Sequence, residues 1–92
     1  DAIPLLRSMS DLVCEMLRDV LAAYAAQDAA QAEDVCSRDK NVDEFYNSIF
    51  RALITYMMEN QRSISECAHL LFVAKNLERA GDHATNVAEM VY

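Results

Sequence analysis

The sequence predicts an all-α protein, an antiparallel up-down-up bundle of three helices that forms a single domain over residues 1–92. Its 92 residues include one Gly and one Pro, so little in the chain can form tight turns or hairpins. Apolar residues recur at three- and four-residue steps along three stretches, which is the spacing of a buried helix face. Short polar segments with capping signals separate these stretches, and short connections make sequential helices antiparallel neighbours.

The first helix is predicted to run from Pro4 to about Gln27. Proline suits the first turn of a helix, because the N–H that it lacks would have no partner there. The apolar positions at helical spacing form the expected packed face, with charged residues set mostly away from it: Leu6, Met9, Val13, Leu17, Val20, Leu21 and Tyr24.

The second helix is predicted from about Ala29 to Glu59 as one continuous helix, which is long for a globular domain. Asp28 is its expected N-cap, because Gln31 follows three residues later in the position that can reach back. Its core line is Val35, Val42, Phe45, Ile49, Leu53 and Tyr56, broadened by Tyr46, Phe50 and Met57. Aromatic residues at such positions are more typical of a core than of a cofactor site.

The third helix is predicted from Asn60 or Ser63 to the end of the chain. Either residue can cap it, and Ser63 has Glu66 in the capping-box position. Its apolar line contains small residues that let another helix approach closely: Leu70, Ala74, Leu77, Gly81, Ala84, Ala88 and Val91. Gly81 costs roughly 1 kcal/mol of helix stability relative to Ala, and close packing is the expected reason for it.

The charge and cysteine content narrow the class of protein. A formal net charge of −7 disfavours nucleic acid and anionic lipid as partners and favours cations or basic protein surfaces. An apolar run such as Leu70 to Ala74 is far shorter than the ~20 residues of a transmembrane helix. Cys14, Cys36 and Cys67 are scattered among apolar neighbours, which favours reduced core residues of a cytosolic protein. The absence of an initiator Met and of a leader suggests a piece of a longer chain.

Two pairs of carboxylates stand out by their spacing. Glu78 and Asp82 are four residues apart, so they lie on one face of a helix, and Asp39 and Asp43 repeat this spacing. A turn near residues 60–61 places Asp43 opposite Glu78, and Asp39 opposite Asp82. All four carboxylates are therefore expected beside one interhelical groove, and Asn86 and Glu89 continue the polar line in the third helix.

Two interpretations of these carboxylates are open at this point. A hard cation prefers several oxygen ligands, so four converging acids would suit one metal ion or a small cluster. Alternatively, both pairs point into water, as most charged helix faces do, with Arg38 and Arg79 softening the repulsion.

Other candidate chemistry in the chain is weaker. His83 directly follows one of these acids and points about 100° away from it, so a solvent-facing or Glu-paired histidine is expected. Glu66 and His69 form an E-x-x-H pair like those of di-iron bundles, which need two such motifs and two further Glu. The residues expected opposite, Ala52 and Thr55, carry no carboxylate. No nucleophile accompanies a base, and no Gly-rich phosphate loop exists.

The acidic motifs carry a resemblance to a known family. The D-x-x-x-D within RDKNVDEFY and the E-x-x-x-D within LERAGDHATNVAE, together with IFRALITYMMEN and LLFVAKNLERAGDHATN, resemble the PhoU family of phosphate-uptake regulators over essentially the whole chain. The resemblance implies a protein of two tandem three-helix repeats, and the ending LERAGDHATNVAEMV is similar to the second repeat. The chain is therefore interpreted as a C-terminal half.

The resemblance implies a cytoplasmic negative regulator of the phosphate regulon. Its implied partners are the ATPase subunit of the phosphate ABC transporter and the phosphate-sensing histidine kinase, with a homodimer also considered. It further implies that the two motifs hold a metal ion or a multinuclear cluster, of iron or zinc first and of manganese or magnesium as alternatives. The implied ligands are Asp39, Asp43, Glu78 and Asp82.

Three hypotheses of function remain, each for a different class of protein. The leading one is a regulatory interaction module that binds metal and has no enzymatic activity. The alternative is a metal-dependent enzyme or a metal-storage bundle of the carboxylate type, and the third is a purely structural bundle. Turnover of a phosphoester or an oxidant would favour the second, and capture of a transporter ATPase or sensor kinase would favour the first.

Overall fold

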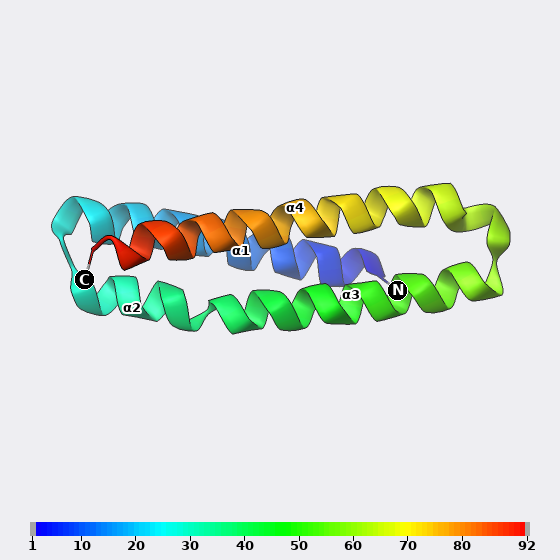
Figure 1. The fold of residues 1–92 in the computed structure, drawn as a ribbon, viewed down its shortest axis with the longest axis horizontal. Helices are drawn as coiled ribbons and strands as arrows, with labels where there is room; N and C mark the ends of the chain where they lie inside the picture. The colour runs from blue at the N-terminus through cyan, green and yellow to red at the C-terminus, as the bar shows by residue number, and fades with distance from the viewer. Residues whose placement is uncertain (1, 92) are drawn as a thin grey trace.

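The computed structural model describes residues 2–91 and is an elongated helical bundle of 50 × 17 × 16 Å. Its elements in order are α1 (Ala2–Ala26), α2 (Ala29–Ser37), α3 (Asp39–Glu59), a short 3-10 helix η1 (Gln61–Ser63) and α4 (Ile64–Glu89). In Figure 1, α2 and α3 together run back along α1, and α4 returns beside both. This arrangement confirms the predicted all-α, up-down-up bundle, and residues 2–91 contain no strand.

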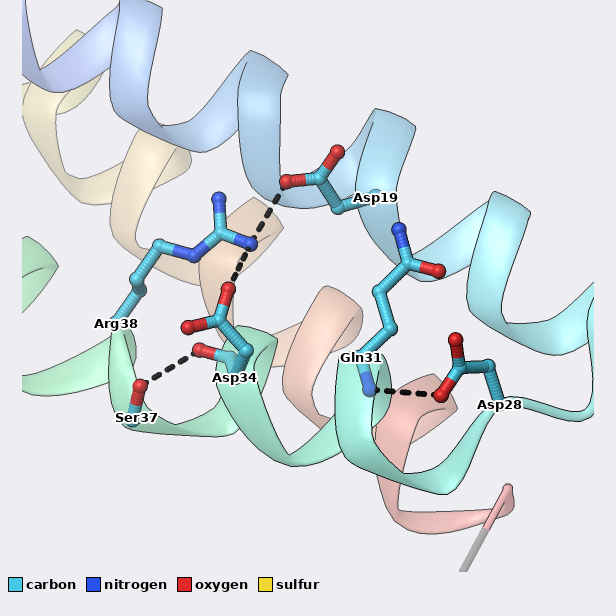
Figure 2. A network of polar contacts seen from close by, with 6 residues as sticks. All are labelled: Asp19, Asp28, Gln31, Asp34, Ser37 and Arg38. Carbon is cyan, nitrogen blue, oxygen red and sulfur yellow. Dashed lines mark hydrogen bonds and ion pairs between the residues drawn. The ribbon is translucent and has the colours of Figure 1, made fainter.

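The predicted second helix is wrong in one respect, because it is two helices. α2 ends at Ser37 and α3 begins at Asp39, with Arg38 between them at φ −82° and ψ −11°. The Arg38 guanidinium is bound to Asp19 of α1 and to Asp34 of α2, which ties the break to the neighbouring helix (Figure 2). Sequence periodicity does not reveal such a break, because the apolar line continues through it.

The first turn ends α1 with a left-handed residue. Gln27 has φ 53°, and the backbone N–H of Asp28 donates to the carbonyl of Ala23 at 2.9 Å, as in a Schellman motif. The side chain of Asp28 then caps α2, since its Oδ1 accepts from the backbone N–H of Gln31 at 3.1 Å (Figure 2). The predicted cap is confirmed.

The second turn uses one of the two predicted caps. Asn60 Oδ1 accepts a hydrogen bond from the backbone N–H of Arg62, which caps η1. Ser63 precedes α4 but makes no side-chain capping bond; its hydroxyl donates instead to the Asn60 carbonyl at 2.7 Å. The expected capping box of Ser63 with Glu66 is therefore wrong, because the hydroxyl is already committed to the turn.

Part of the buried face of α1 is shifted by one residue from the apolar positions predicted for it. Met16 and Ala23 are fully buried, whereas Leu21 is 65% exposed and Leu17 and Tyr24 are also exposed. Successive residues are rotated by 100°, so positions directly after the buried ones turn toward water even when they are apolar. The same correction applies in α3, where two aromatic residues of the predicted line are exposed: Phe50 and Tyr56.

The small residues of α4 bring it close to α3. Ala74, Gly81, Ala84 and Ala88 are buried, as predicted. A Cβ built on Gly81 would lie 3.3 Å from Cγ1 of Val42, tighter than ordinary van der Waals contact. The expected close packing is confirmed, and it occurs beside Asp43 and Asp82, so it determines the width of the groove that these residues share.

The three cysteines are free thiols. Cys67 is buried and Cys36 is partly buried, as expected of core residues. Cys14 is exposed, so its predicted place in the core is wrong. It follows the buried Val13 by one residue, which turns its side chain out of the core.

Candidate metal site between α3 and α4

The four acidic residues come from the first two turns of α3 and from the second half of α4. Asp39 opens α3 and Asp43 follows one turn later, while Glu78 and Asp82 are one turn apart on α4. After burial, which is the largest cause, the negative charge of Asp82 raises the pKa of Asp39, and that of Glu78 raises the pKa of Asp43. The structure therefore brings together the two facing pairs that the sequence places opposite each other.

The surroundings of Asp39 perturb its pKa. Burial raises the pKa of Asp39, and the negative charges of Asp82 and Glu78 raise it further. The nearby side chain of Thr85 acts in the opposite direction and lowers this pKa. Because like charges and burial both disfavour the carboxylate, this end of the groove favours uptake of a proton or a cation.

Asp43 shares the same electrostatic environment although its side chain is exposed. Burial is again the largest cause that raises its pKa, followed by the charge of Asp39 on its own helix and that of Glu78 across the groove. The charge of Asp82 also contributes. Each of the other three acids therefore acts on Asp43, so the four carboxylates form one electrostatic cluster, which we call the acidic cluster.

The acidic cluster contains a buried oxygen atom that has no hydrogen-bond partner among the described residues. Asp39 Oδ1 is buried and accepts no hydrogen bond from the described residues. A buried polar atom without a partner costs about 1–3 kcal/mol. A cation in the groove would remove this cost, and carboxylate oxygens are the ligands that hard cations prefer. The residues present therefore fit a metal ion chemically.

Lys75 and Tyr46 border the acidic cluster, although neither was among the residues predicted for the site. Lys75 Nζ donates to Glu78 Oε1 at 2.8 Å and lies 5.3 Å from the centre of the Tyr46 ring. The hydrogen bond and charge of Glu78 raise the pKa of Lys75, with smaller contributions from Tyr46 and Asp82. The three-residue spacings from Lys75 to Glu78 and from Asp43 to Tyr46 are the signal that could have indicated both neighbours.

The cluster is not a ready-made coordination sphere. As the side chains are oriented, no group of three or more His, Cys, Asp or Glu within residues 2–91 is placed to hold one metal ion. The acids face each other in pairs, and the ammonium of Lys75 occupies one side of Glu78. Metal binding would therefore require side-chain rotation in the groove.

The other candidate residues lie elsewhere. Arg38 does not soften the repulsion between the acids as expected, because its guanidinium is bound to Asp19 and Asp34 (Figure 2). His83 is exposed, as predicted. Glu66 lines a cavity together with residues of α3 that offer no carboxylate at the opposing positions: Ala52 and Thr55. The di-iron pattern is therefore incomplete there.

A comparison with protein families identifies the chain. The model of the PhoU domain matches residues 6–91. This chain belongs to the PhoU family. The match includes all four residues of the acidic cluster, and the resemblance found in the two acidic motifs is confirmed as a family relationship.

Curated PhoU relatives are similar over nearly the whole chain. A protein of Zymomonas mobilis described as a phosphate-specific transport system accessory protein PhoU homolog is 58% identical over 90 residues, covering 98% of this chain and 38% of the relative. A homolog of the same description from Caulobacter vibrioides is 60% identical over 84 residues, covering 91% of this chain and 36% of the relative. The chain thus spans less than two-fifths of the length of these two relatives.

A solved structure has the same fold. The crystal structure of PhoU from Pseudomonas aeruginosa superposes with a TM-score of 0.91 at 42% sequence identity. The match covers 92% of this chain and 41% of that one. No helix within residues 2–91 is long and apolar enough to cross a membrane.

Proposed function

We propose that this chain is the metal-binding regulatory module of a PhoU protein and forms the C-terminal half of a two-repeat molecule. The complete protein acts in the cytoplasm as a negative regulator of the phosphate regulon, without enzymatic activity of its own. Its partners are the ATPase subunit of the phosphate ABC transporter and the phosphate-sensing histidine kinase. Membership of the PhoU family and relatives described as accessory proteins of phosphate-specific transport support this proposal.

The metal part of the proposal rests on one observation, the buried and unpartnered Oδ1 of Asp39 inside the acidic cluster. Asp39, Asp43, Glu78 and Asp82 would hold iron or zinc, with manganese or magnesium as alternatives. The metal would supply positive charge to a groove whose carboxylates repel each other. Because its ligands come from α3 and α4, it would also cross-link the two helices.

Such a cross-link suits regulation better than turnover. A ligand that binds only the folded state stabilises it by RT ln(1 + [L]/Kd), about 2.7 kcal/mol at a hundredfold excess over Kd. Metal binding would therefore stiffen the α3–α4 pair and fix the surface that these helices present. A partner that recognises that surface would then respond to the metal.

The metal site is tested by thermal unfolding of wild type and Asp39→Asn with chelator and with added Mn²⁺, Zn²⁺ or iron. Wild type should gain stability with metal, and Asp39→Asn should gain much less while being equal or better in chelator. Glu44→Gln is the matched control, since Glu44 is an exposed acid of α3 that lines the opposite groove against α1. Midpoints that do not respond to any of these metals in wild type would refute the site.

Metal content and partners are tested on material from cells. Elemental analysis of protein purified without added metal or chelator should find bound metal, and a pull-down should capture the transporter ATPase or the sensor kinase.

The regulatory role is tested genetically. Deletion of the gene for the full-length protein should derepress phosphate-starvation genes in phosphate-replete cells, and this half alone should not restore full repression. Unchanged expression after deletion would exclude the regulatory role.

A further inference from the structure

Lys75 is the residue whose ammonium group pairs with an acid of the cluster. Its Nζ lies 2.8 Å from Glu78 Oε1, and the two residues are one turn apart on α4. The Glu78 side chain is 16% exposed, whereas that of Lys75 is 56% exposed. The carboxylate is therefore held within the groove, while the ammonium reaches it from the solvent side on a flexible stem.

The position of Lys75 places it in competition with a metal ion. A metal held by the acidic cluster would use an oxygen of Glu78, and one of its oxygens accepts from Lys75. Two cations cannot occupy the same side of one carboxylate without strong repulsion. Full coordination by Glu78 therefore requires the ammonium to move.

Tyr46 provides a second place for the displaced ammonium. Lys75 Nζ already lies 5.3 Å from the centre of the Tyr46 ring, within the ~6 Å range of a cation–π interaction. Tyr46 is itself held by stacking on Phe50, with ring centroids 6.4 Å apart. A small rotation of the exposed lysine side chain can thus release Glu78 while the charge stays over the ring.

We propose that Lys75 is a tethered counter-cation that competes with metal for Glu78 and thereby sets the affinity of the acidic cluster. Without metal, Lys75 neutralises one of the four carboxylates; with metal bound, its ammonium rests over Tyr46. This inference rests on the proposed metal site and adds a residue outside the two acidic motifs. Lys75 acts on the metal through Glu78, so it is a positioning residue and not a ligand.

The test compares the Kd of Mn²⁺ for wild type, Lys75→Met, Lys75→Arg and Arg79→Met by titration calorimetry. Mn²⁺ alone is the probe, because it prefers carboxylates, whereas zinc would also bind the free thiols. Arg79→Met is the matched control: it removes the same charge from an exposed neighbouring position of α4. Circular dichroism of each variant checks that the bundle is intact.

Lys75→Met should bind Mn²⁺ about three- to fivefold more tightly than wild type, because the competing cation is gone. Lys75→Arg should stay within about twofold of wild type, and so should Arg79→Met, whose charge is not on Glu78. In chelator, Lys75→Met should unfold at a lower temperature than wild type, and Mn²⁺ should raise its midpoint by a larger increment.

The outcomes separate this inference from the metal site itself. If wild type binds Mn²⁺ and Lys75→Met binds it equally or more weakly, the competition is refuted while the site stands. Equal tightening in Lys75→Met and Arg79→Met would also refute it, because a general change of net charge would then explain the effect. Absence of Mn²⁺ binding to wild type would overturn this inference, whereas the metal site itself is refuted only if iron and zinc also fail to stabilise wild type.

Discussion

The backbone of Gly81 in α4 lies against the side chain of Val42 in α3, so closely that a Cβ at Gly81 would be 3.3 Å from Val42 Cγ1. Val42 is fully buried, and its β-branched side chain has little freedom to move. This contact therefore sets the distance between the two helices that carry the acidic cluster.

Gly81→Ala should change the free energy of unfolding by less than about 1 kcal/mol. Alanine gains roughly 1 kcal/mol of helix propensity, and the tight contact with Val42 offsets this gain. In a Val42→Ala background the same substitution should be clearly stabilising, because the crowding atoms are absent. Urea unfolding of the four proteins measures this coupling, and additive effects of the two substitutions would contradict it.

The raised pKa values of Asp39 and Asp43 predict a pH dependence of stability in the absence of metal. An acid whose pKa is raised by folding stabilises the folded state fully below its ordinary value of 3.8, and this contribution is lost as pH rises through the raised pKa. Relative to the Asp39→Asn/Asp43→Asn variant, wild type should therefore lose stability as the pH increases above about 4. Thermal unfolding of dialysed, metal-free protein at several pH values provides the measurement.

The variant Glu44→Gln serves as the reference for this pH series, since it changes an acid outside the cluster. Its stability relative to wild type should vary less with pH than that of the double variant. A wild type that gains stability over the double variant as pH rises would mean that the carboxylates are stabilised as anions, contrary to their surroundings in the groove.

The ion pairs at the break between α2 and α3 should differ in strength. Arg38 joins Asp19 and Asp34 at equal distances of 2.7 Å, but Asp34 is 64% exposed and Asp19 only 37%. Asp34→Asn should cost less than about 0.5 kcal/mol, whereas Asp19→Asn should cost about 0.5–1.5 kcal/mol. Denaturant unfolding ranks the two variants. A larger loss for Asp34→Asn would show that the ion pair of Arg38 with Asp34 contributes more than the pair with Asp19.

The cysteines should differ in reactivity. All three should titrate as free thiols after denaturation without reductant, and recovery of only one would mean that the other two form a disulfide. In the folded protein, Cys14 should react first with a thiol reagent because it is exposed, while Cys67, 1% exposed, should react only as fast as the bundle opens. Mass spectrometry of partially labelled protein identifies the order.

The sequence by itself determined the helical class, both turn positions and the register of the helices. This register places Asp39 opposite Asp82 and Asp43 opposite Glu78. These features depend on periodicity, on capping residues and on counting along rigid helices of fixed rise, and all of that information is local. The close packing at Gly81 could also be predicted, because a glycine that destabilises its helix within an apolar line indicates a compensating contact.

Only the tertiary structure decided which borderline apolar residues of α1 and α3 are buried, where the second helix breaks and which aromatic ring lies beside the ammonium of Lys75. Leu21 and Met16 are both apolar, and only the positions of the neighbouring helices decide that Met16 is buried and Leu21 exposed. The helix is interrupted at Arg38, and the guanidinium of this residue binds Asp19, which belongs to α1 and is distant in sequence. Lys75 lies over Tyr46 only because α3 and α4 pack side by side, a relationship across helices that no local pattern encodes.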